Sequence, residues 1–121
     1  MYLIDSHVVI WDYFDDPRRQ FRHTKLLQSD ARQFVSVASL WEIEIKIAAK
    51  RLKLPPDFSD LVIEDSYEIL DISLAHALAS ARLPRHHGDP FDRLLIAQAQ
   101  AEGLTILTAD RKFAAYDVAV I

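Results

Sequence analysis

The hydrophobic residues of this chain fall alternately into short apolar runs and into longer stretches with helical spacing. The runs predict strands, at residues 2–5, 34–37, 67–72, 104–108 and 118–121. The stretches between them predict helices, at residues 6–14, 23–30, 36 or 39 to 52, just after 57, 73–83, 90–103 and briefly after 110. Because strands and helices alternate, we predict an α/β fold, a three-layer α/β/α domain with a central, mostly parallel sheet.

Local residue choices indicate where several of these helices begin or end. Ser36 or Ser39 is suited to cap the third helix, and Ser73 is suited to cap a later one. The last long helix has Pro90 just inside its start and Gly103 at its end, which is the usual asymmetry of helix termini.

Composition then narrows the class of protein. The chain has 121 residues, half of them apolar, which fits one domain over residues 1–121 with a substantial core. It has no cysteine, which excludes disulfides and thiolate metal sites, and only two glycines, which excludes Walker-type and dinucleotide-binding loops. No apolar run approaches the roughly 20 residues of a membrane span. The first residues do not read as a signal peptide, so we expect a cytoplasmic protein that contacts no membrane.

Charge changes the picture further, because the net charge of −4 hides two basic clusters. One comprises Arg18, Arg19, Arg22, His23 and Lys25, and the other comprises Lys46, Lys50, Arg51 and Lys53. Basic patches on an acidic protein suit a site for a polyanion whose carboxylates are offset by bound cations. Solvated helix faces explain the same clusters.

Two carboxylates follow predicted strands. Asp5 ends the first strand, and Asp110 lies two residues beyond the strand at 104–108. Since ligands bind beyond the carboxyl ends of the strands in open α/β sheets, both acids are expected at one rim. The alternative for each is the N-cap of a helix, where aspartate is favoured.

Two further carboxylates lie on predicted helices. Asp92 shares a helix face with apolar residues, where a lone charge is costly unless it is paired or binds a metal. A capping box that begins at Asp89 explains Asp92 as well. Glu42 borders the apolar arc of its helix, and an exposed pair with Lys46 is the alternative. Spacing alone does not choose between Glu42 and Glu44.

The chemistry of these candidate ligands is uniform. With no cysteine and no paired histidine spacing, an oxygen-only set selects hard cations such as Mg²⁺ or Mn²⁺. A Mg²⁺ ion held by a few carboxylates completes its shell with water and substrate phosphate, which is typical of phosphodiester chemistry.

Four segments carry a family resemblance: LIDSH at 3–7, SLWEI at 39–43, HHGDPFDRLLIAQA at 86–99 and LTAD at 107–110. They resemble the PIN domain, and more closely the VapC-type toxins of bacterial toxin–antitoxin pairs. The likeness covers nearly the whole chain in order. Its specific part is DPFDR at 89–93, since an isolated aspartate after a strand is not specific.

The resemblance implies a role for each acid. The catalytic and metal-binding carboxylates would be Asp5, Glu42 rather than Glu44, Asp92 and Asp110, with Mg²⁺ as the ion and Mn²⁺ as an alternative. Ser6, Thr108 and Arg93 would support them, and Ser6 stands where these proteins often carry threonine. For Asp89 we favour helix capping, while His86 and His87 are open between phosphate contact and a plain loop.

The implied function is that of a toxin, a Mg²⁺-dependent endoribonuclease that hydrolyses RNA phosphodiester bonds. The implied partners are an RNA substrate and a separately encoded antitoxin. We expect the antitoxin to insert an Arg or Lys into the acidic pocket, because a guanidinium pairs with two carboxylates at once. A homodimer is implied too, and Trp11, Trp41 and Ile45 would either face the second copy or belong to the core.

Two other classes of protein could explain this set of acids. A receiver-type signalling domain would need adjacent acids after the first strand and a lysine after the last, and the sequence has neither. A catalytically inactive PIN-fold module that binds RNA or protein is the alternative, and the four complete acids argue against it.

Overall fold

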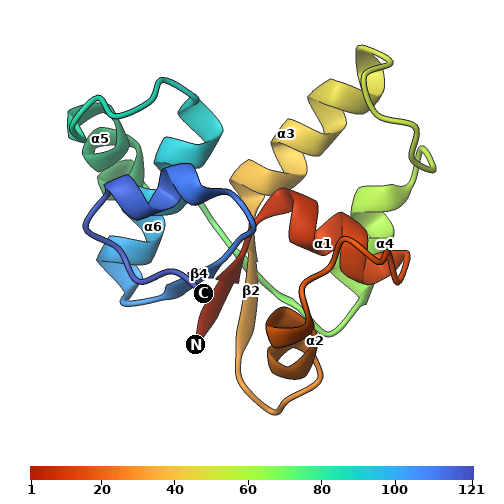
Figure 1. The fold of residues 1–121 in the computed structure, drawn as a ribbon. Helices are drawn as coiled ribbons and strands as arrows, with labels where there is room; N and C mark the ends of the chain where they lie inside the picture. The colour runs from red at the N-terminus through yellow and green to blue at the C-terminus, as the bar shows by residue number, and fades with distance from the viewer.

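Four short parallel strands form one sheet at the centre of the molecule, between two layers of helices (Figure 1). The computed structural model describes the backbone of residues 1–121 and every side chain except that of Phe21. The strands are β1 (Tyr2–Ile4), β2 (Gln33–Ser36), β3 (Glu68–Leu70) and β4 (Thr105–Leu107). The helices are α1 (Ser6–Tyr13), α2 (Phe21–Leu27), α3 (Val37–Ala48), α4 (Phe58–Glu64), α5 (Leu74–Arg82) and α6 (Pro90–Glu102), followed by a 3₁₀ helix, η1 (Arg111–Ala115). The predicted α/β fold with a parallel sheet is confirmed.

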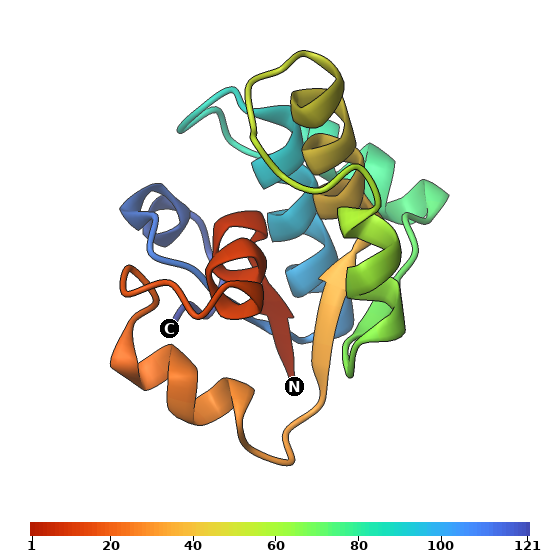
Figure 2. The same ribbon diagram turned by 90° about the vertical axis from the view of Figure 1, so that its right-hand side faces the viewer.

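Alternation along the strands separates two cores. In β1, Leu3 faces one side of the sheet and Ile4 the other, and both are fully buried. Leu3 belongs to the core with Leu95 of α6 and Phe113 of η1, whereas Ile4 belongs to the core with Phe58 of α4. Helices α5 and α6 therefore cover one face, and α1, α2 and α4 cover the other, as Figures 1 and 2 show from two sides.

The strand order β3-β2-β1-β4 creates a reversal beside β1. The chain passes from β1 outward to β2 and β3, and then returns to add β4 on the other side of β1. The two directions use helices on opposite faces, so the connections diverge and leave a crevice at the carboxyl ends of β1 and β4. Asp5 and Thr108 are the residues that directly follow these two strands.

The predicted ends of two helices are confirmed. Ser36, rather than Ser39, caps α3, because its side chain accepts a hydrogen bond from a backbone N–H two residues on, at 2.9 Å. Asp89 caps α6, Pro90 is its first residue, and Gly103 ends it at a φ of 67°, a left-handed conformation that glycine adopts without strain. No helix among the described residues combines the length and the apolar character needed to cross a membrane.

Some boundaries differ from the prediction. Helix α2 covers residues 21–27 rather than 23–30. Helix α3 ends at Ala48 rather than near 52, because the chain reverses at Lys50, which has a φ of 57°. Residues 118–121 make one parallel bridge, between Val120 and Ile106, instead of a strand. The chain bends through residues 116–118, so only its last residues run alongside β4.

Candidate active site

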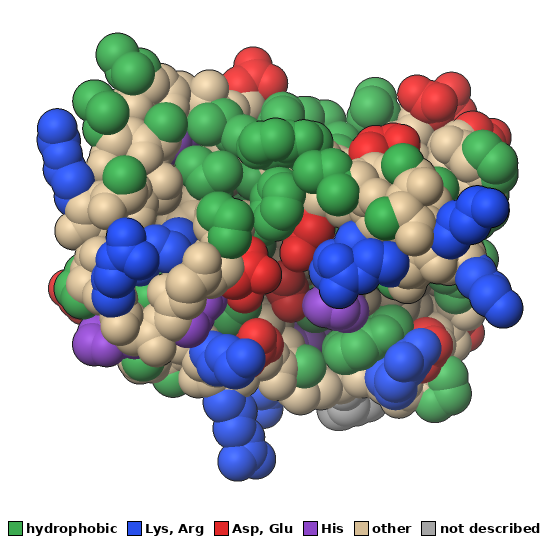
Figure 3. Space-filling view, turned by 90° about the horizontal axis from the view of Figure 1, so that it is seen from above, with side chains coloured by type: hydrophobic (Ala, Val, Ile, Leu, Met, Phe, Trp, Pro, Cys, Tyr) green, Lys and Arg blue, Asp and Glu red, His purple; other side chains and the backbone are tan. Residues whose placement is uncertain are grey.

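A hollow of about 300 Å³ opens at the carboxyl ends of β1 and β4, and we call it the acidic pocket. Its walls come from segments far apart in the chain: the end of β1 with the start of α1, helix α3, the loop before α6 with the first turn of that helix, and the segment after β4. The four carboxylates that the sequence singles out, Asp5, Glu42, Asp92 and Asp110, all line it. Figure 3 looks onto this face and shows carboxylates near its centre, with basic side chains on either side.

Asp5 is the most buried of the four acids, with 5% of its surface exposed. Its carboxylate accepts a hydrogen bond from the Thr108 hydroxyl at 3.0 Å. Although Asp5 occupies the N-cap position of α1, its side chain makes no capping hydrogen bond to the helix and accepts one from Thr108 instead. Burial raises the pKa of Asp5, and His7, with Nδ1 4.0 Å from the carboxylate, acts in the opposite direction.

Glu42 is almost as buried, at 7% exposure, whereas Glu44 on the same helix is exposed. Its Oε1 accepts a hydrogen bond from the Ser6 hydroxyl at 2.9 Å, and its Oε2 lies 3.2 Å from the Lys46 ammonium. The pair with Lys46 that spacing predicted is therefore present, but it lies in the wall of the pocket rather than on a solvated face. The packing of α3 against α1, where Ser6 begins the helix, distinguishes Glu42 from Glu44.

Asp92 lies half-buried in the first turn of α6. Burial raises its pKa to about 7, and repulsion from the surrounding acids, Asp89 foremost, adds to the rise. The capping-box explanation fails in part, because the backbone N–H of Asp89 points at Nδ1 of His87, at 3.4 Å, instead of at Asp92. Asp92 therefore carries a charge that a proton or a cation would stabilise.

Asp110 combines the two roles that the sequence leaves open. Its carboxylate accepts a hydrogen bond from the Lys112 N–H at 2.9 Å, which caps η1, and it also lines the acidic pocket. Its own N–H donates to the Thr108 hydroxyl at 3.0 Å. Since that hydroxyl donates in turn to Asp5, Thr108 links the acids that follow β1 and β4.

The pocket also has basic side chains: Lys46, which spacing places beside Glu42, and His7, His87 and Lys112, which spacing does not bring together. His87 lies in the loop before α6, and its ring packs edge-on against Tyr116 with the centroids 5.6 Å apart. His86 packs against the same tyrosine at 4.9 Å and is exposed. Of the tandem histidines, His87 is thus the one in the pocket wall. Loop residues have no periodicity from which this placement follows.

The family is decided by a comparison with known protein families. The sequence model of the PIN domain matches residues 2–119. The chain belongs to the PIN domain family. No curated protein matches it in sequence.

Solved structures share the PIN fold of this chain over nearly its whole length. A chain of VapBC2 from Rickettsia felis, crystallised with a DNA fragment from the promoter, has 16% identity and a TM-score of 0.76, with 99% of this chain and 96% of that one covered. FitAcB from Neisseria gonorrhoeae has 24% identity and a TM-score of 0.71, with 100% and 96% covered. DNA-bound VapBC from Salmonella typhimurium has 22% identity and a TM-score of 0.70, with 99% and 96% covered. At these identities the likeness shows a shared fold.

Arg93 of the PIN domain is buried against the loop between α5 and α6. Its guanidinium donates to the carbonyl oxygens of Ser80 and Leu83 at 2.9 Å, and of Pro84 at 3.0 Å. A longer contact, of 3.4 Å, reaches the carbonyl oxygen of His87. The support expected from Arg93 would therefore act by holding this loop against α6 rather than by contact with the acids.

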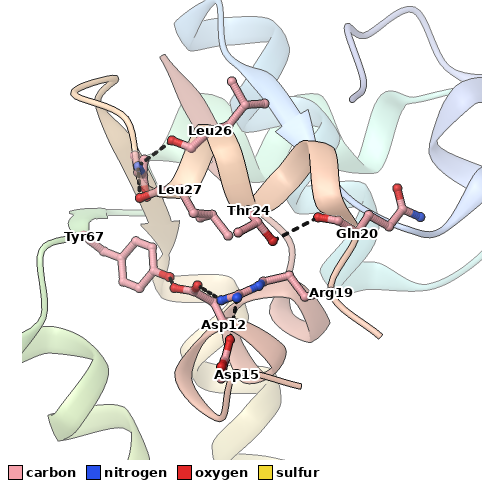
Figure 4. Close-up of polar contacts among 9 residues, drawn as sticks. Asp12, Asp15, Arg19, Gln20, Thr24, Leu26, Leu27 and Tyr67 are labelled. Atoms are coloured by element: carbon pink, nitrogen blue, oxygen red, sulfur yellow. Dashed lines mark hydrogen bonds and ion pairs between the residues drawn. The ribbon is translucent and has the colours of Figure 1, made fainter. Parts of the chain in front are cut away.

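Part of the predicted basic cluster at 18–25 is engaged in structural contacts of the PIN domain (Figure 4). Arg19 donates to Asp12 at 2.6 Å and to Asp15 at 2.5 Å, and Asp12 also accepts a hydrogen bond from the Tyr67 hydroxyl at 2.5 Å. His23 is fully buried, with Nε2 2.6 Å from the carbonyl oxygen of the last residue. These contacts fix the segment after α1, so Arg19 and His23 are not part of an open patch for a polyanion.

The donor set of the acidic pocket suits a hard divalent cation, although it is not a closed site as it stands. Four carboxylates supply oxygen ligands, which Mg²⁺ and Mn²⁺ prefer. Burial, and then repulsion from the neighbouring acids, raises the pKa of Asp92 to about 7, and a bound cation would oppose both effects. Among the described residues, no three acidic or histidine side chains converge closely enough to hold one ion. Binding of one ion by these side chains would therefore require their rotation, and water or substrate oxygens would complete its shell.

Proposed function

We propose that this PIN domain is a metal-dependent endoribonuclease, with Mg²⁺ or Mn²⁺ as its cofactor, and that it acts as the toxin of a toxin–antitoxin pair. The observation that carries the nuclease part is the acidic pocket, where four carboxylates from distant segments meet. Acids held together against their own repulsion are typical of a functional site. Membership of the PIN family and the fold shared with chains from VapBC and FitAB structures support the toxin part.

The proposed metal ligands are Asp5, Glu42, Asp92 and Asp110. These residues would hold a divalent ion, and the chemistry it would supply is a lowered pKa for a bound water and stabilisation of negative charge on the phosphate. The chain's own residues orient the ligands: the Thr108 hydroxyl restrains Asp5, and the Ser6 hydroxyl restrains Glu42. Both hydroxyls are buried, so these hydrogen bonds exchange little with solvent.

The lysines of the pocket suit the backbone of an RNA substrate. Lys46 and Lys112 line the pocket beside the acids and place positive charge within reach of a phosphate. Lys46 lies 3.2 Å from Glu42, so an arriving phosphate would share this ammonium with the carboxylate. The lysines would bind the phosphates of the substrate, while the carboxylates would bind divalent cations from solution. A protein with a net negative charge could therefore bind an anionic substrate.

Cleavage of a labelled single-stranded RNA tests the proposed activity. We expect hydrolysis with Mg²⁺ or Mn²⁺, products with a 5′-phosphate, and no cleavage in EDTA. Asp110→Asn, which keeps an N-cap but removes a ligand charge, should cleave far more slowly. Cleavage by clean protein in EDTA contradicts the proposal. RNA that is bound but never cut with either ion would favour the alternative, an inactive PIN-fold binding module.

We further propose that a separately encoded antitoxin inhibits the protein by inserting an Arg, or less well a Lys, into the acidic pocket. A guanidinium can pair with two carboxylates at once, and the pocket offers four. Such a side chain would occupy the place of the cation, so inhibition should weaken as the Mg²⁺ concentration rises. If inhibition is equal at all Mg²⁺ concentrations and survives Arg→Ala substitutions in the antitoxin, the partner binds elsewhere.

We also propose that the protein is a homodimer through the apolar face of α3. Trp41 is 53% exposed and Ile45 is 45% exposed, so neither belongs to the core, whereas Trp11 is half-buried. Trp41 packs edge-on against Phe91 of α6 at 5.2 Å, which extends the face beside the acidic pocket. Figure 3 shows apolar side chains gathered next to the carboxylates on this side of the molecule. In sedimentation equilibrium we expect a dimer for the wild type and a monomer for Ile45→Glu; a monomeric wild type contradicts the proposal.

A further inference from the structure

A second hollow lies beside the acidic pocket and shares a wall with it. It measures about 270 Å³ and is lined by Asp5, His7, Trp11, Ala109 and Asp110. Asp5, His7 and Asp110 line the acidic pocket as well. The second hollow differs in having the indole of Trp11 in its wall, and we call it the Trp11 hollow.

The aromatic wall of the Trp11 hollow is held in place before any ligand arrives. The His7 ring lies one helical turn before Trp11, with the centroids 5.9 Å apart. The guanidinium carbon of Arg18 lies 5.5 Å from the centroid of the indole. Arg18 in turn donates hydrogen bonds of 2.8 and 3.1 Å to Asp16. Trp11 is half-buried and packs against the core, so little side-chain entropy is lost when a planar ligand binds.

We propose that the Trp11 hollow binds one nucleobase of a single-stranded RNA, on the nucleotide next to the phosphate in the acidic pocket; this rests on the ribonuclease function proposed above. Bases stack on aromatic side chains with little dependence on sequence, because every base has a π face. A base inside a duplex is covered by its neighbours and cannot enter such a hollow. A substrate that uses the Trp11 hollow would therefore present an unpaired nucleotide there.

A third hollow continues the same surface and offers cations for the RNA backbone. It measures about 510 Å³ and shares Ala109 and Asp110 with the Trp11 hollow. Arg22 and Arg111 line it, and both are exposed. A strand that leaves the Trp11 hollow in this direction would place its phosphates beside two guanidinium groups. A stacking surface next to a cationic track is the usual arrangement in proteins that bind single strands.

Tryptophan fluorescence reports on this site directly, because the chain has only two tryptophans. Trp41→Phe leaves Trp11 as the single indole, and Asp92→Asn in the same protein prevents cleavage while leaving the walls of the Trp11 hollow unchanged. This double variant would be titrated with single-stranded hexaadenylate in Mg²⁺, with binding followed in parallel by fluorescence anisotropy of the labelled oligonucleotide. We expect saturable quenching of Trp11 by hexaadenylate, and none by a hexamer of abasic ribose phosphates or by an RNA duplex. Binding without quenching, or equal quenching by the abasic hexamer, would overturn the proposal.

Substitution of Trp11 in the otherwise wild-type protein gives an independent measurement. Trp11→Leu should raise the KM for a single-stranded RNA about tenfold, whereas Trp11→Phe, which keeps a stacking ring, should raise it less than about threefold. A substrate with an abasic nucleotide beside the cleaved bond should remove the difference between wild type and Trp11→Leu. Melting temperatures show whether each variant folds. If Trp11→Leu does not fold, the abasic substrate with wild type and Trp11→Phe still decides the matter.

The base-binding site and the nuclease function fail in different ways. If the protein cleaves RNA with Mg²⁺ but cleaves the abasic substrate equally well, the nuclease function is supported and the base-binding site is contradicted. If hexaadenylate quenches Trp11 but the protein cuts no RNA, the base-binding site is supported and the nuclease function is contradicted. Quenching by an arginine-containing peptide and not by hexaadenylate would assign the hollow to a protein partner, against the proposal.

Discussion

Two groups of carboxylates lie at opposite ends of α1, and their surroundings differ. At the far end of the helix, Asp12 and Asp15 pair with Arg19, and Asp16 pairs with Arg18. In the acidic pocket, the basic side chains paired with the acids are Lys46, whose ammonium lies 3.2 Å from Glu42, and His7, whose ring nitrogen lies 4.0 Å from Asp5. Hydrogen bonds from Arg18 lower the pKa of Asp16 to about 2, whereas burial raises the pKa of Asp92 to about 7.

This difference separates structural acids from functional ones. A carboxylate that already accepts hydrogen bonds from a guanidinium has little capacity left for another cation. A carboxylate that is partly desolvated and surrounded by other acids destabilises the fold until a proton or a cation reaches it. The first group therefore stabilises the segment after α1, and the second group retains its affinity for a cation.

Substitution of Asp92 tests the difference between the two groups of acids most strongly, because the largest effect is expected there. Asp92→Asn keeps the shape of the side chain but removes the charge of a proposed metal ligand, so kcat for RNA cleavage should fall about 100-fold or more. The same change relieves repulsion in the pocket. In metal-free buffer at pH 8, the melting temperature should therefore rise by roughly 3–8 °C. Steady-state kinetics and thermal melts measure the two effects.

Asp89→Asn is the matched control for Asp92. It removes one charge from the same helix start, and asparagine can still accept the hydrogen bonds from the Phe91 and Asp92 N–H groups that cap α6. Its kcat should stay within about threefold of the wild type. Equal losses from the two substitutions would show that the roles of Asp89 and Asp92 have been misassigned.

The structural group should respond in the opposite way, with loss of stability and no loss of activity. Arg19 has 14% of its side chain exposed, and Arg19→Met would leave Asp12 and Asp15 without their guanidinium. We expect the free energy of unfolding to fall by about 2 kcal/mol, because a partly buried acid loses its partner. Urea denaturation measures this, and kcat should remain within about twofold of the wild-type value.

Arg18→Met is the control variant for Arg19→Met. The pair of Arg18 with Asp16 is exposed, with 70% of the arginine side chain accessible. Exposed ion pairs are screened by water and salt, so the free energy of unfolding should change much less than it does in Arg19→Met. If Arg19→Met costs no more than Arg18→Met, the Arg19 network does not hold the segment after α1.

The two groups should also differ in the sign of their pH dependence. The pKa of Asp92, about 7 in the folded protein, lies above its ordinary value of 3.8, so this acid destabilises the fold increasingly as the pH rises from about 4 to about 7. The pKa of Asp16, about 2, lies below 3.8, so this acid stabilises the fold above about pH 4 and loses that effect as the pH falls toward 2.

Melting curves of two variants against pH, without metal, measure these signs. The gain in melting temperature from Asp92→Asn should be close to zero at about pH 4 and complete above about pH 7. The loss from Asp16→Asn should be present above about pH 4 and should disappear near pH 2. A gain from Asp92→Asn that is the same at every pH would show that repulsion between charges is not its cause.

The sequence predicts the order of strands and helices because each element has its own local pattern. Asp89, Pro90 and Gly103 mark the ends of α6 through backbone chemistry that needs no tertiary contact. The early end of α3 was not predictable in this way, because the reversal at Lys50 places a non-glycine residue in a left-handed conformation. The tail at 118–121 was apolar enough for a strand, but its bend leaves a single bridge to β4.

Sheet topology and family resemblance predicted some residues of the site, and the others could not be predicted from the sequence. The strand ends indicate Asp5 and Asp110, since parallel strands present their carboxyl ends at one rim. Glu42 and Glu44 are equivalent by periodicity, and the hydrogen bond from Ser6 that distinguishes them crosses between two helices. Lys112, His7 and His87 also line the acidic pocket. Their placement depends on how the chain folds around the pocket, and local sequence spacing does not reveal it.

A smaller loss of activity than at Asp92 is expected at Ser6, which sharpens the distinction between a ligand and a residue that orients one. Ser6→Ala removes the donor that restrains Oε1 of Glu42 at 2.9 Å but leaves the contact of Oε2 with Lys46 at 3.2 Å. Residues that orient metal ligands typically contribute about 10-fold or more to metal affinity, and because Lys46 still restrains Glu42 we expect a loss of about 3- to 10-fold in cleavage at low Mg²⁺. Ser6→Thr, which keeps the hydroxyl, should cleave like the wild type.

Raising the Mg²⁺ concentration separates this orienting role from simple packing. An oriented carboxylate binds its ion with less loss of side-chain entropy, so excess Mg²⁺ should restore most of the rate of Ser6→Ala. It should restore little of the rate of Asp92→Asn, where a ligand charge itself is missing. Cleavage rates measured over a Mg²⁺ series for both variants and for Ser6→Thr provide the comparison. If Ser6→Ala lowers the melting temperature but shows the Mg²⁺ dependence of the wild type, the hydroxyl stabilises the start of α1 and does not orient Glu42.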